Sequence, residues 1–349
     1  SRGRGEWTSD ASGMSGGWSW WGGGDLLLHA AREWRRVGRR VEIVLAPRHA
    51  GEELPLGGGV LGDFLRREGF SCHVVEAINR WDGLGALIQG EPTLALCFGP
   101  AWIFTEAVIA AFPLGMINFN GIPLPRYLGG AHYTWQILNG DRSGGCFLQE
   151  ITVEVDRGPI LRSHRYLLPV GVRLPRDYFR GNHEEAVRFL DRAIADMVAD
   201  LPFEPLPYAS LDPFRLYFPR LLTRENGYID WDWSGEEIER FCAAFDDPYP
   251  GAMTFLEGQV VHLREVRLER CEGATHPFVA GLVLRRDAAG AWIGVRGGIL
   301  VVGAAHGEEG ADLLPGFREG RRLHTPAEWL ERARAFRPVL DGAGVRIRG

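Results

Sequence analysis

The chain has 349 residues, 45% of them hydrophobic and 24% charged, which is the composition of an ordinary globular protein. Its formal net charge is −6 and it contains no lysine, so it lacks the concentrated basic face of a nucleic-acid-binding protein. No apolar run approaches the roughly 20 residues of a membrane-spanning helix, so we expect neither a nucleic acid nor a membrane as partner. A chain of this length predicts about two domains.

The cysteines predict neither a metal site nor a disulfide framework, because they are odd in number, far apart and without a C-x-x-C pair. They are Cys72, Cys97, Cys146, Cys242 and Cys271. This usage fits a reducing compartment, and the N-terminus shows no signal-peptide pattern, so we expect a cytoplasmic protein. Residues 1–13 are polar and glycine-rich, and we expect them to form a flexible tail.

Strands and helices are predicted to alternate through the first 120 residues. An aromatic run leads into three glycines at 22–24, which we interpret as a tight strand-to-helix turn. The alternative, a phosphate cradle, does not fit the G-x-G-x-x-G pattern. Asp25 is the expected cap of the next helix. The expected helices span 26–37, 61–68 and 104–112, and the expected strands 41–45, 72–75, 93–98 and 116–119. This alternation predicts a doubly wound parallel α/β sheet, in which ligands bind at the carboxyl ends of the strands.

The next segment is predicted to hold a strand pair around Asp156 and a long amphipathic helix preceded by Asn182. Residues 201–219 are rich in proline and aromatic residues and are predicted to be a linker. The expected elements are helices at 132–138 and 184–201 and strands at 145–151 and 160–168.

The last third of the chain predicts a small barrel with two flanking helices. Ser234 and Glu237 form a capping box for a helix to Phe245, and Thr325 and Glu328 form another for a helix to 336. Short strands with glycine turns between these helices are typical of an OB-like β-barrel. The expected strands span 260–268, 278–285, 292–296 and 299–302.

One stretch of about forty residues carries an ordered set of motifs, and a second set follows near the barrel. The first contains Asn118, Asn120, Leu124-Pro125, Tyr127, Gly129, Trp135-Gln136-Ile137, Gly144, Asp156, Gly158 and Ile160. The second contains Phe218-Pro-Arg, Asn226-Gly-Tyr-Ile-Asp-Trp231 and Asp247-Pro-Tyr-Pro-Gly-Ala252. The first set resembles the central signature of the folate-dependent formyltransferases. The second resembles the C-terminal domain of the methionyl-tRNA and sugar formyltransferases.

This resemblance implies a division into a catalytic domain and an OB-like domain. We expect a tail at 1–13, a Rossmann-like formyltransferase catalytic domain at 14–202, a linker at 203–217, the C-terminal domain at 218–337 and a tail at 338–349.

The resemblance also implies which side chains perform the chemistry. Asn118 matches the family's catalytic Asn, which donates to the oxyanion, and Asp156 matches the carboxylate that accepts the amine's proton. Asn120 stands where the family has its catalytic His, and an amide carries no titratable proton. His132 is a candidate replacement imidazole, although a single histidine beside an apolar helix is more often structural. Asn-x-Asn and Asp-x-Gly taken singly are also ordinary turn sequences.

N10-formyltetrahydrofolate is the formyl donor that the resemblance implies. In the family the segment after the buried strand lines the pterin pocket, and a second segment faces it. These segments correspond here to Ala101, Trp102, Ile103 and Phe104, with Val153, Glu154 and Val155 opposite.

The acceptor is expected to be a primary amine on a small molecule, because the net negative charge disfavours a tRNA acceptor stem. A nucleotide-linked amino sugar or an amine of a natural product fits the two-domain arrangement. Two alternatives stay open: changed chemistry, such as hydrolysis of the formyl donor or transfer of another acyl unit, and a non-catalytic folate- or sugar-binding protein. The sequence also leaves a homodimer open.

Overall fold

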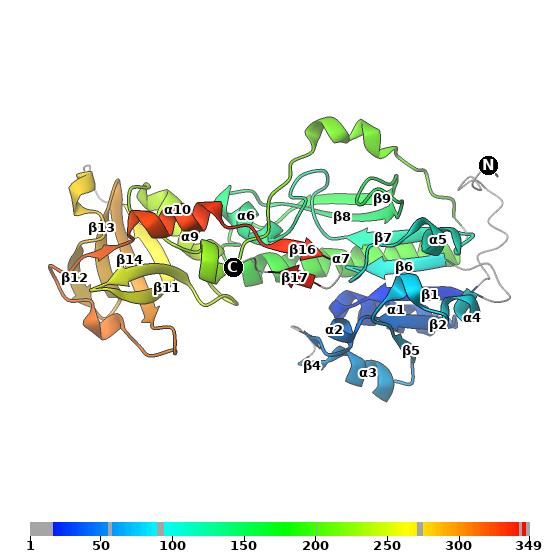
Figure 1. Cartoon of the computed structure of the whole chain (residues 1–349). Helices are drawn as coiled ribbons and strands as arrows, with labels where there is room; N and C mark the ends of the chain where they lie inside the picture. The colour runs from blue at the N-terminus through cyan, green and yellow to red at the C-terminus, as the bar shows by residue number, and fades with distance from the viewer. Residues whose placement is uncertain are drawn as a thin grey trace.

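Two large β-sheets, each with its own helices, and two short strand pairs make up the described part of the protein in the computed structural model (Figure 1). The structure describes residues 17–54, 58–88, 94–199, 201–270, 275–341 and 344–346. The expected tail at 1–13 and Cys271 lie outside these ranges. None of the helices in the described ranges has both the length and the apolar character needed to cross a membrane.

The first sheet has seven strands in the order β5-β2-β1-β6-β7-β8-β9. Its first five strands are parallel, and β8 and β9 are antiparallel to their neighbours. This arrangement confirms the predicted parallel α/β fold. The strands are β1 (Trp18–Gly22), β2 (Val41–Leu45), β5 (Ser71–Val74), β6 (Leu94–Phe98), β7 (Met116–Asn120), β8 (Ser143–Glu150) and β9 (Ile160–Leu167).

Helices cover both faces of this sheet. One face packs against α1 (Gly24–Arg36) and α7 (Pro175–Val198), and the other against α4 (Leu84–Ile88) and α5 (Glu106–Ala110). Side chains alternate along each strand, so Phe98 and Phe119 face α1 and α7, whereas Cys97 and Met116 face α4 and α5. The short elements α2 (Pro47–Ala50), β3 (Glu53–Leu54), β4 (Gly59–Val60), α3 (Leu61–Arg67) and α6 (His132–Leu138) complete this region.

Tryptophans of β1 explain why an aromatic run forms the centre of the sheet. Trp18 and Trp20 pack against Trp34 of α1, with ring centroids 4.4 and 5.8 Å away. Trp21 points to the other face, toward Trp102 and Phe104. A strand with neighbours on both sides and helices on both faces buries every side chain, and these large rings fill both cores.

The second sheet is antiparallel, in the order β12-β13-β14-β11-β10-β15, and it curls as Figure 1 shows. Its strands are β10 (Ala252–Leu256), β11 (Gln259–Glu269), β12 (Val283–Asp287), β13 (Gly290–Val295), β14 (Gly298–His306) and β15 (Leu323–His324). The helices of this region are α8 (Thr223–Asn226), α9 (Gly235–Ala244) and α10 (Ala327–Ala335). This architecture confirms the predicted barrel-like C-terminal region. The strand expected at 278–285 is shorter, because Pro277–Val279 forms a 3-10 turn.

Of the three predicted helix caps, one is confirmed and two are wrong. Ser234 and Glu237 form the expected capping box of α9. The prediction for Asp25 was wrong: Gly23 is the N-cap of α1, and Asp25 lies in the first turn. The predicted capping box at Thr325 was also wrong, since Pro326 is the N-cap of α10. The Thr325 hydroxyl instead lies 3.2 Å from that of Thr254.

The long helix α7 begins earlier than predicted. It starts at Pro175, where Asp177 accepts a hydrogen bond from the backbone N–H of Leu174. Asn182 therefore lies inside the helix, where its Nδ2 donates to the carbonyl of Tyr178. The charged and polar residues of the first two turns had obscured the periodic pattern.

One hydrophobic cluster joins the two regions. Ile137 of α6 and Tyr178 of α7 belong to the same buried cluster as Ile238 and Phe241 of α9. Residues 203–217, expected as a linker, include two 3-10 turns at Tyr208–Ser210 and Asp212–Phe214. Two short strands, β16 (Val339–Asp341) and β17 (Gly344–Arg346), pair within residues 338–349, where a tail was expected.

Candidate active site

Three side-chain amides form a hydrogen-bonded series across β7 and β8, which we call the amide relay (Asn118, Asn120 and Gln149). The Asn118 Nδ2 donates to Asn120 Oδ1 at 3.0 Å, and Asn120 Nδ2 donates to Gln149 Oε1 at 2.9 Å. Gln149 Nε2 then donates to the carbonyl oxygen of Gly158 at 2.9 Å. Asn118 and Gln149 are direct partners in the antiparallel pairing, which places their side chains on the same face.

The direction of the relay follows from its last member. A backbone carbonyl can only accept, so Gln149 must present its NH2 group to Gly158 and its oxygen to Asn120. Asn120 must in turn present its oxygen to Asn118. The relay therefore fixes the rotation of the Asn118 amide, whose Oδ1 is buried and has no hydrogen-bond partner. The unused oxygen can only accept a hydrogen bond, while the relay occupies one of the two N–H groups of Nδ2 and leaves the second as a donor.

Gln149 is the residue that the sequence analysis missed. Its side chain is only 2% exposed, and it connects the strand that carries Asn118 to the loop that carries Asp156. The available signal was a glutamine inside the otherwise apolar run of β8. A polar residue in the middle of a buried strand requires partners, and here both partners belong to the candidate site.

Asp156 lies on the loop between β8 and β9, with a left-handed backbone (φ 56°) that Asp tolerates better than most residues. The loop runs so close to β8 that a Cβ at Gly158 would lie 1.8 Å from the Glu150 carbonyl oxygen, so this position needs glycine. Asp156 is exposed, yet the surrounding protein partly desolvates its carboxyl group and raises its pKa, an effect that Arg215 opposes. A raised pKa makes a carboxylate a better proton acceptor.

The residues expected around the pterin divide into buried and exposed sets. Trp102 and Phe104 belong to the core beneath β6 and β7, and the Trp102 indole donates to the carbonyl of Glu76 at 3.0 Å. Ala101 is partly buried. The side chains of Ile103, Val153 and Val155 are about 60% exposed, and Glu154 is exposed as well. Exposed apolar side chains on two loops suit a flat ring, but their role in folate binding stays a prediction.

His132 begins α6 and packs its ring against Tyr133, with centroids 4.1 Å apart. Burial lowers its pKa to about 4, and the charge of Arg220 acts in the same direction. Its Nε2 has no hydrogen-bond partner. A neutral imidazole can accept a proton, but the described hydrogen bonds do not connect His132 to the amide relay, so its auxiliary role stays a prediction.

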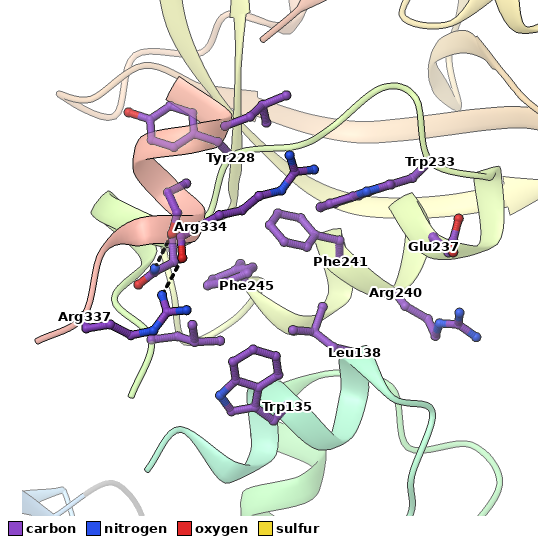
Figure 2. A pocket seen from close by; sticks show the side chains of 14 residues that line it. Trp135, Leu138, Tyr228, Trp233, Glu237, Arg240, Phe241, Phe245, Arg334 and Arg337 are labelled. Carbon is purple, nitrogen blue, oxygen red and sulfur yellow. Dashed lines mark hydrogen bonds between the residues drawn. The ribbon is translucent and has the colours of Figure 1, made fainter. Parts of the chain in front are cut away.

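Several cavities lie outside the relay. One of them, of about 440 Å³, is lined by residues of α6, α9 and α10 (Figure 2). Aromatic rings including Trp135 and Phe241 line it, and the Arg334 guanidinium is held by Asp230 at 2.6 Å. Figure 2 shows Arg240 turned away from these rings. None of the expected site residues lines this cavity. A smaller one, of about 310 Å³, opens at the carboxyl ends of the parallel strands.

Two family models match the chain. The model described as formyl transferase matches residues 85–168, and the model of the formyl transferase C-terminal domain matches residues 221–314. The chain belongs to the formyltransferase family. The first match contains all the expected catalytic residues and Gln149, and the second begins where the C-terminal motifs begin. Members of this family are enzymes that transfer formyl groups.

The chain has curated relatives among the methionyl-tRNA formyltransferases. That of Roseiflexus sp. (strain RS-1) is 33% identical over 174 residues, which are 48% of this chain and 51% of the relative. That of Treponema pallidum (strain Nichols) is 31% identical over 229 residues, which are 63% and 66%. The chain thus spans half to two thirds of the length of these relatives.

Solved structures share the fold of this chain at low sequence identity. The sugar 3N-formyltransferase WlaRD, determined in the presence of dTDP and 5-N-formyl-THF, has a TM-score of 0.61 and 13% identity, with coverage of 82% of this chain and 96% of that one. HypX from Aquifex aeolicus in complex with tetrahydrofolic acid has a TM-score of 0.54 and 16% identity, with coverage of 84% and 45%. At these identities the likeness concerns the fold alone.

Proposed function

We propose that this protein transfers a formyl group from N10-formyltetrahydrofolate to a primary amine of a small acceptor, an amino sugar in particular. The observation that carries the proposal is the amide relay, which orients Asn118 and ties the Asp156 loop to the same strands through Gly158. Donor and acceptor are substrates here, and the protein supplies fixed dipoles and a proton acceptor.

The proposed reaction needs two protein groups. The acceptor nitrogen attacks the formyl carbon, the carbonyl bond opens, and negative charge develops on its oxygen. An N–H of Asn118, already oriented by the relay, donates to that oxygen. Asp156 takes the proton that the attacking nitrogen releases, and the carbonyl reforms as the bond to N10 breaks. The folate nitrogen then takes that proton back from Asp156, which restores the carboxylate, and the products are the formamide and tetrahydrofolate.

Asn120 has a positioning role in this proposal. Its oxygen accepts from Asn118 and its NH2 group donates to Gln149, so it orients the catalytic amide. A His at this position could accept from Asn118 in the same way and also share a proton with a carboxylate. Because Asn120 carries no titratable proton, Asp156 alone accepts the proton in this proposal.

A small acceptor is supported by charge and by the fold neighbours. The net charge of −6 and the absence of lysine disfavour a nucleic-acid acceptor. The titles of two neighbours name a sugar 3N-formyltransferase and an N-formyltransferase bound to folinic acid and dTDP-3-aminofucose. The methionyl-tRNA relatives make the tRNA the competing acceptor, which the following experiment includes.

The experiment incubates the full chain with N10-formyltetrahydrofolate and a panel of amino sugars, other small amines and methionyl-tRNA, and follows release of tetrahydrofolate. Release that depends on a small amine supports the proposal. Release without any amine would identify a hydrolase, and folate binding without release would identify a non-catalytic binder. Either result, or dependence on methionyl-tRNA alone, would overturn it.

Asp156→Asn is the matching variant, and Asp191→Asn is its control. We expect Asp156→Asn to abolish turnover and leave the folded structure intact, because an amide cannot accept the proton. Asp191 is an exposed carboxylate of α7 whose Oδ1 lies 2.7 Å from His29 Nε2, so its replacement removes a carboxylate without changing a contact of the Asp156 loop. Full activity in Asp156→Asn would remove Asp156 from the mechanism.

A further inference from the structure

The cavity of about 310 Å³ lies at the carboxyl ends of β1, β2, β6 and β7, on the face of the sheet that α1 and α7 cover. Gly121, which follows Asn120 at the end of β7, is part of its wall. Asn118 and Asn120 point to the opposite face, because they alternate with Phe119. The cavity and the amide relay therefore meet at the end of one strand. We call it the strand-end cavity.

Two of its polar groups have buried atoms without partners. His49 is 7% exposed, and its Nδ1 makes no hydrogen bond. Burial, aided by the charge of Arg48, lowers its pKa to about 4, so the ring is neutral at pH 7 and offers one donor and one acceptor. Asp25, in the first turn of α1, has a buried Oδ2 that also lacks a partner. Buried polar atoms left unpaired are costly, and a ligand would satisfy them.

Glu52 provides a second carboxyl group at the same wall. Its Oε2 accepts from the backbone N–H of Gly24 at 3.1 Å, and burial raises its pKa. Position 23 favours glycine, because a Cβ there would lie 2.5 Å from this oxygen and 2.8 Å from Cδ2 of His49, and these side chains would have to move. The glycine turn thus lets the backbone approach both polar side chains closely. His183 of α7 lies across the cavity, and burial lowers its pKa also.

The remaining wall is aromatic. Phe98 and Phe119 come from strand ends, Tyr133 from α6 and Phe179 from α7. No arginine is among the lining residues, and the sequence has no lysine. Arg48 is close enough to influence Glu52 but does not line the cavity. A phosphate group inside would therefore face two carboxyl groups without a compensating cation.

We infer that the strand-end cavity binds the hydroxylated ring of the acceptor, a pyranose or similar uncharged sugar ring, while any nucleotide diphosphate attached to it stays outside. Carboxyl and imidazole groups hydrogen-bond to ring hydroxyls, and aromatic side chains contact the apolar face of the ring. The volume is at the lower end for small-molecule sites, which suits a single ring. This inference rests on the proposed function, since the amine must reach the relay over the end of β7.

The test measures KM for amino-sugar acceptors in His49→Leu and Glu52→Ala, with His262→Leu as the matched control. His262 is a partly buried histidine of the second sheet, away from this cavity. The probes are a dTDP-linked 3-amino sugar, a dTDP-linked 4-amino sugar and putrescine. Because one hydrogen bond contributes about 1 kcal/mol, we expect KM for the amino sugars to rise roughly fivefold in each cavity variant. KM for putrescine and the folate affinity should stay as in wild type.

Unchanged amino-sugar KM values in both cavity variants would overturn the inference, as would an equal rise for putrescine. A loss of folate affinity in these variants would assign the cavity to the donor instead. If wild type transfers to no small amine, the proposed function fails, and binding of the free amino sugar is then measured by saturation-transfer NMR. Binding that disappears in His49→Leu would still support the sugar site, and no binding to wild type would refute it.

Discussion

Replacing Gln149 by Leu should lower kcat, although we propose no contact between this side chain and a substrate. The variant has a similar volume but removes two hydrogen bonds, one from Asn120 and one to the Gly158 carbonyl. Both of these groups would lose their partner in a nearly closed interior, and each such loss costs about 1–3 kcal/mol. Asn120 is partly exposed, so water relieves part of its loss. We expect the free energy of unfolding to fall by about 2–4 kcal/mol.

The catalytic consequence follows from the direction of the relay. Without Gln149, neither Asn120 nor Asn118 has a fixed rotation, and the amide that we propose as the oxyanion donor is no longer preorganised. Loss of one such donor lowers kcat by about 10²–10³. Urea unfolding gives the stability change, and steady-state transfer gives kcat and KM for the folate.

Gln136→Leu is the matched control for this variant. Gln136 is equally buried, at 1% exposed, and its Nε2 donates to the Ser143 carbonyl, away from the relay. We expect this variant to lose stability but keep kcat. A kcat of Gln149→Leu that matches the control would show that the relay does not position Asn118, and the reasoning would be wrong.

Asn120→His should fold normally and retain or raise kcat, because an imidazole can accept from Asn118 and also share a proton. A circular-dichroism melt checks the fold, and the transfer assay checks kcat. A loss of activity would contradict this prediction and would mean that the local geometry has adapted to the amide. Glu52→Gln should raise the melting temperature at pH 7. The folded-state pKa of Glu52 lies above its usual value, so its contribution to stability is present at low pH and is lost as pH rises through that pKa. Melting curves from pH 4 to 8 should show the advantage of Gln disappearing toward pH 4, and an advantage that persists unchanged at pH 4 would contradict this.

Local patterns predicted the parallel sheet and most of its strands, because a strand buried on both faces has an almost continuous apolar sequence. The strand 41–45 and the helix 132–138 were predicted with the bounds that the structure shows. Predictions failed where tertiary contacts decide. The cap of α1 is Gly23, where a Cβ would crowd the side chains of His49 and Glu52.

Motifs identified residues of the candidate site but not the contacts between them. Asn118, Asn120 and Asp156 were found from their order and spacing in the sequence. Gln149 carries no such motif, and its importance depends on the register of β7 against β8, which the sequence does not reveal. The strand-end cavity was also unpredictable, because His49 and His183 are 134 positions apart and meet only through packing of α7 on the sheet.

The segment that joins the two sheets is fastened to the loop of Asp156. Ile160 exchanges two backbone hydrogen bonds with Leu206, at 2.9 and 2.8 Å, just beyond the end of the loop. Arg157 within the loop is paired with Asp212 of the same segment. The chain then continues to Phe218, whose N–H donates to the Leu128 carbonyl, and enters the C-terminal region. In the proposed mechanism, a shift of that region would therefore be transmitted to Asp156 through the main chain.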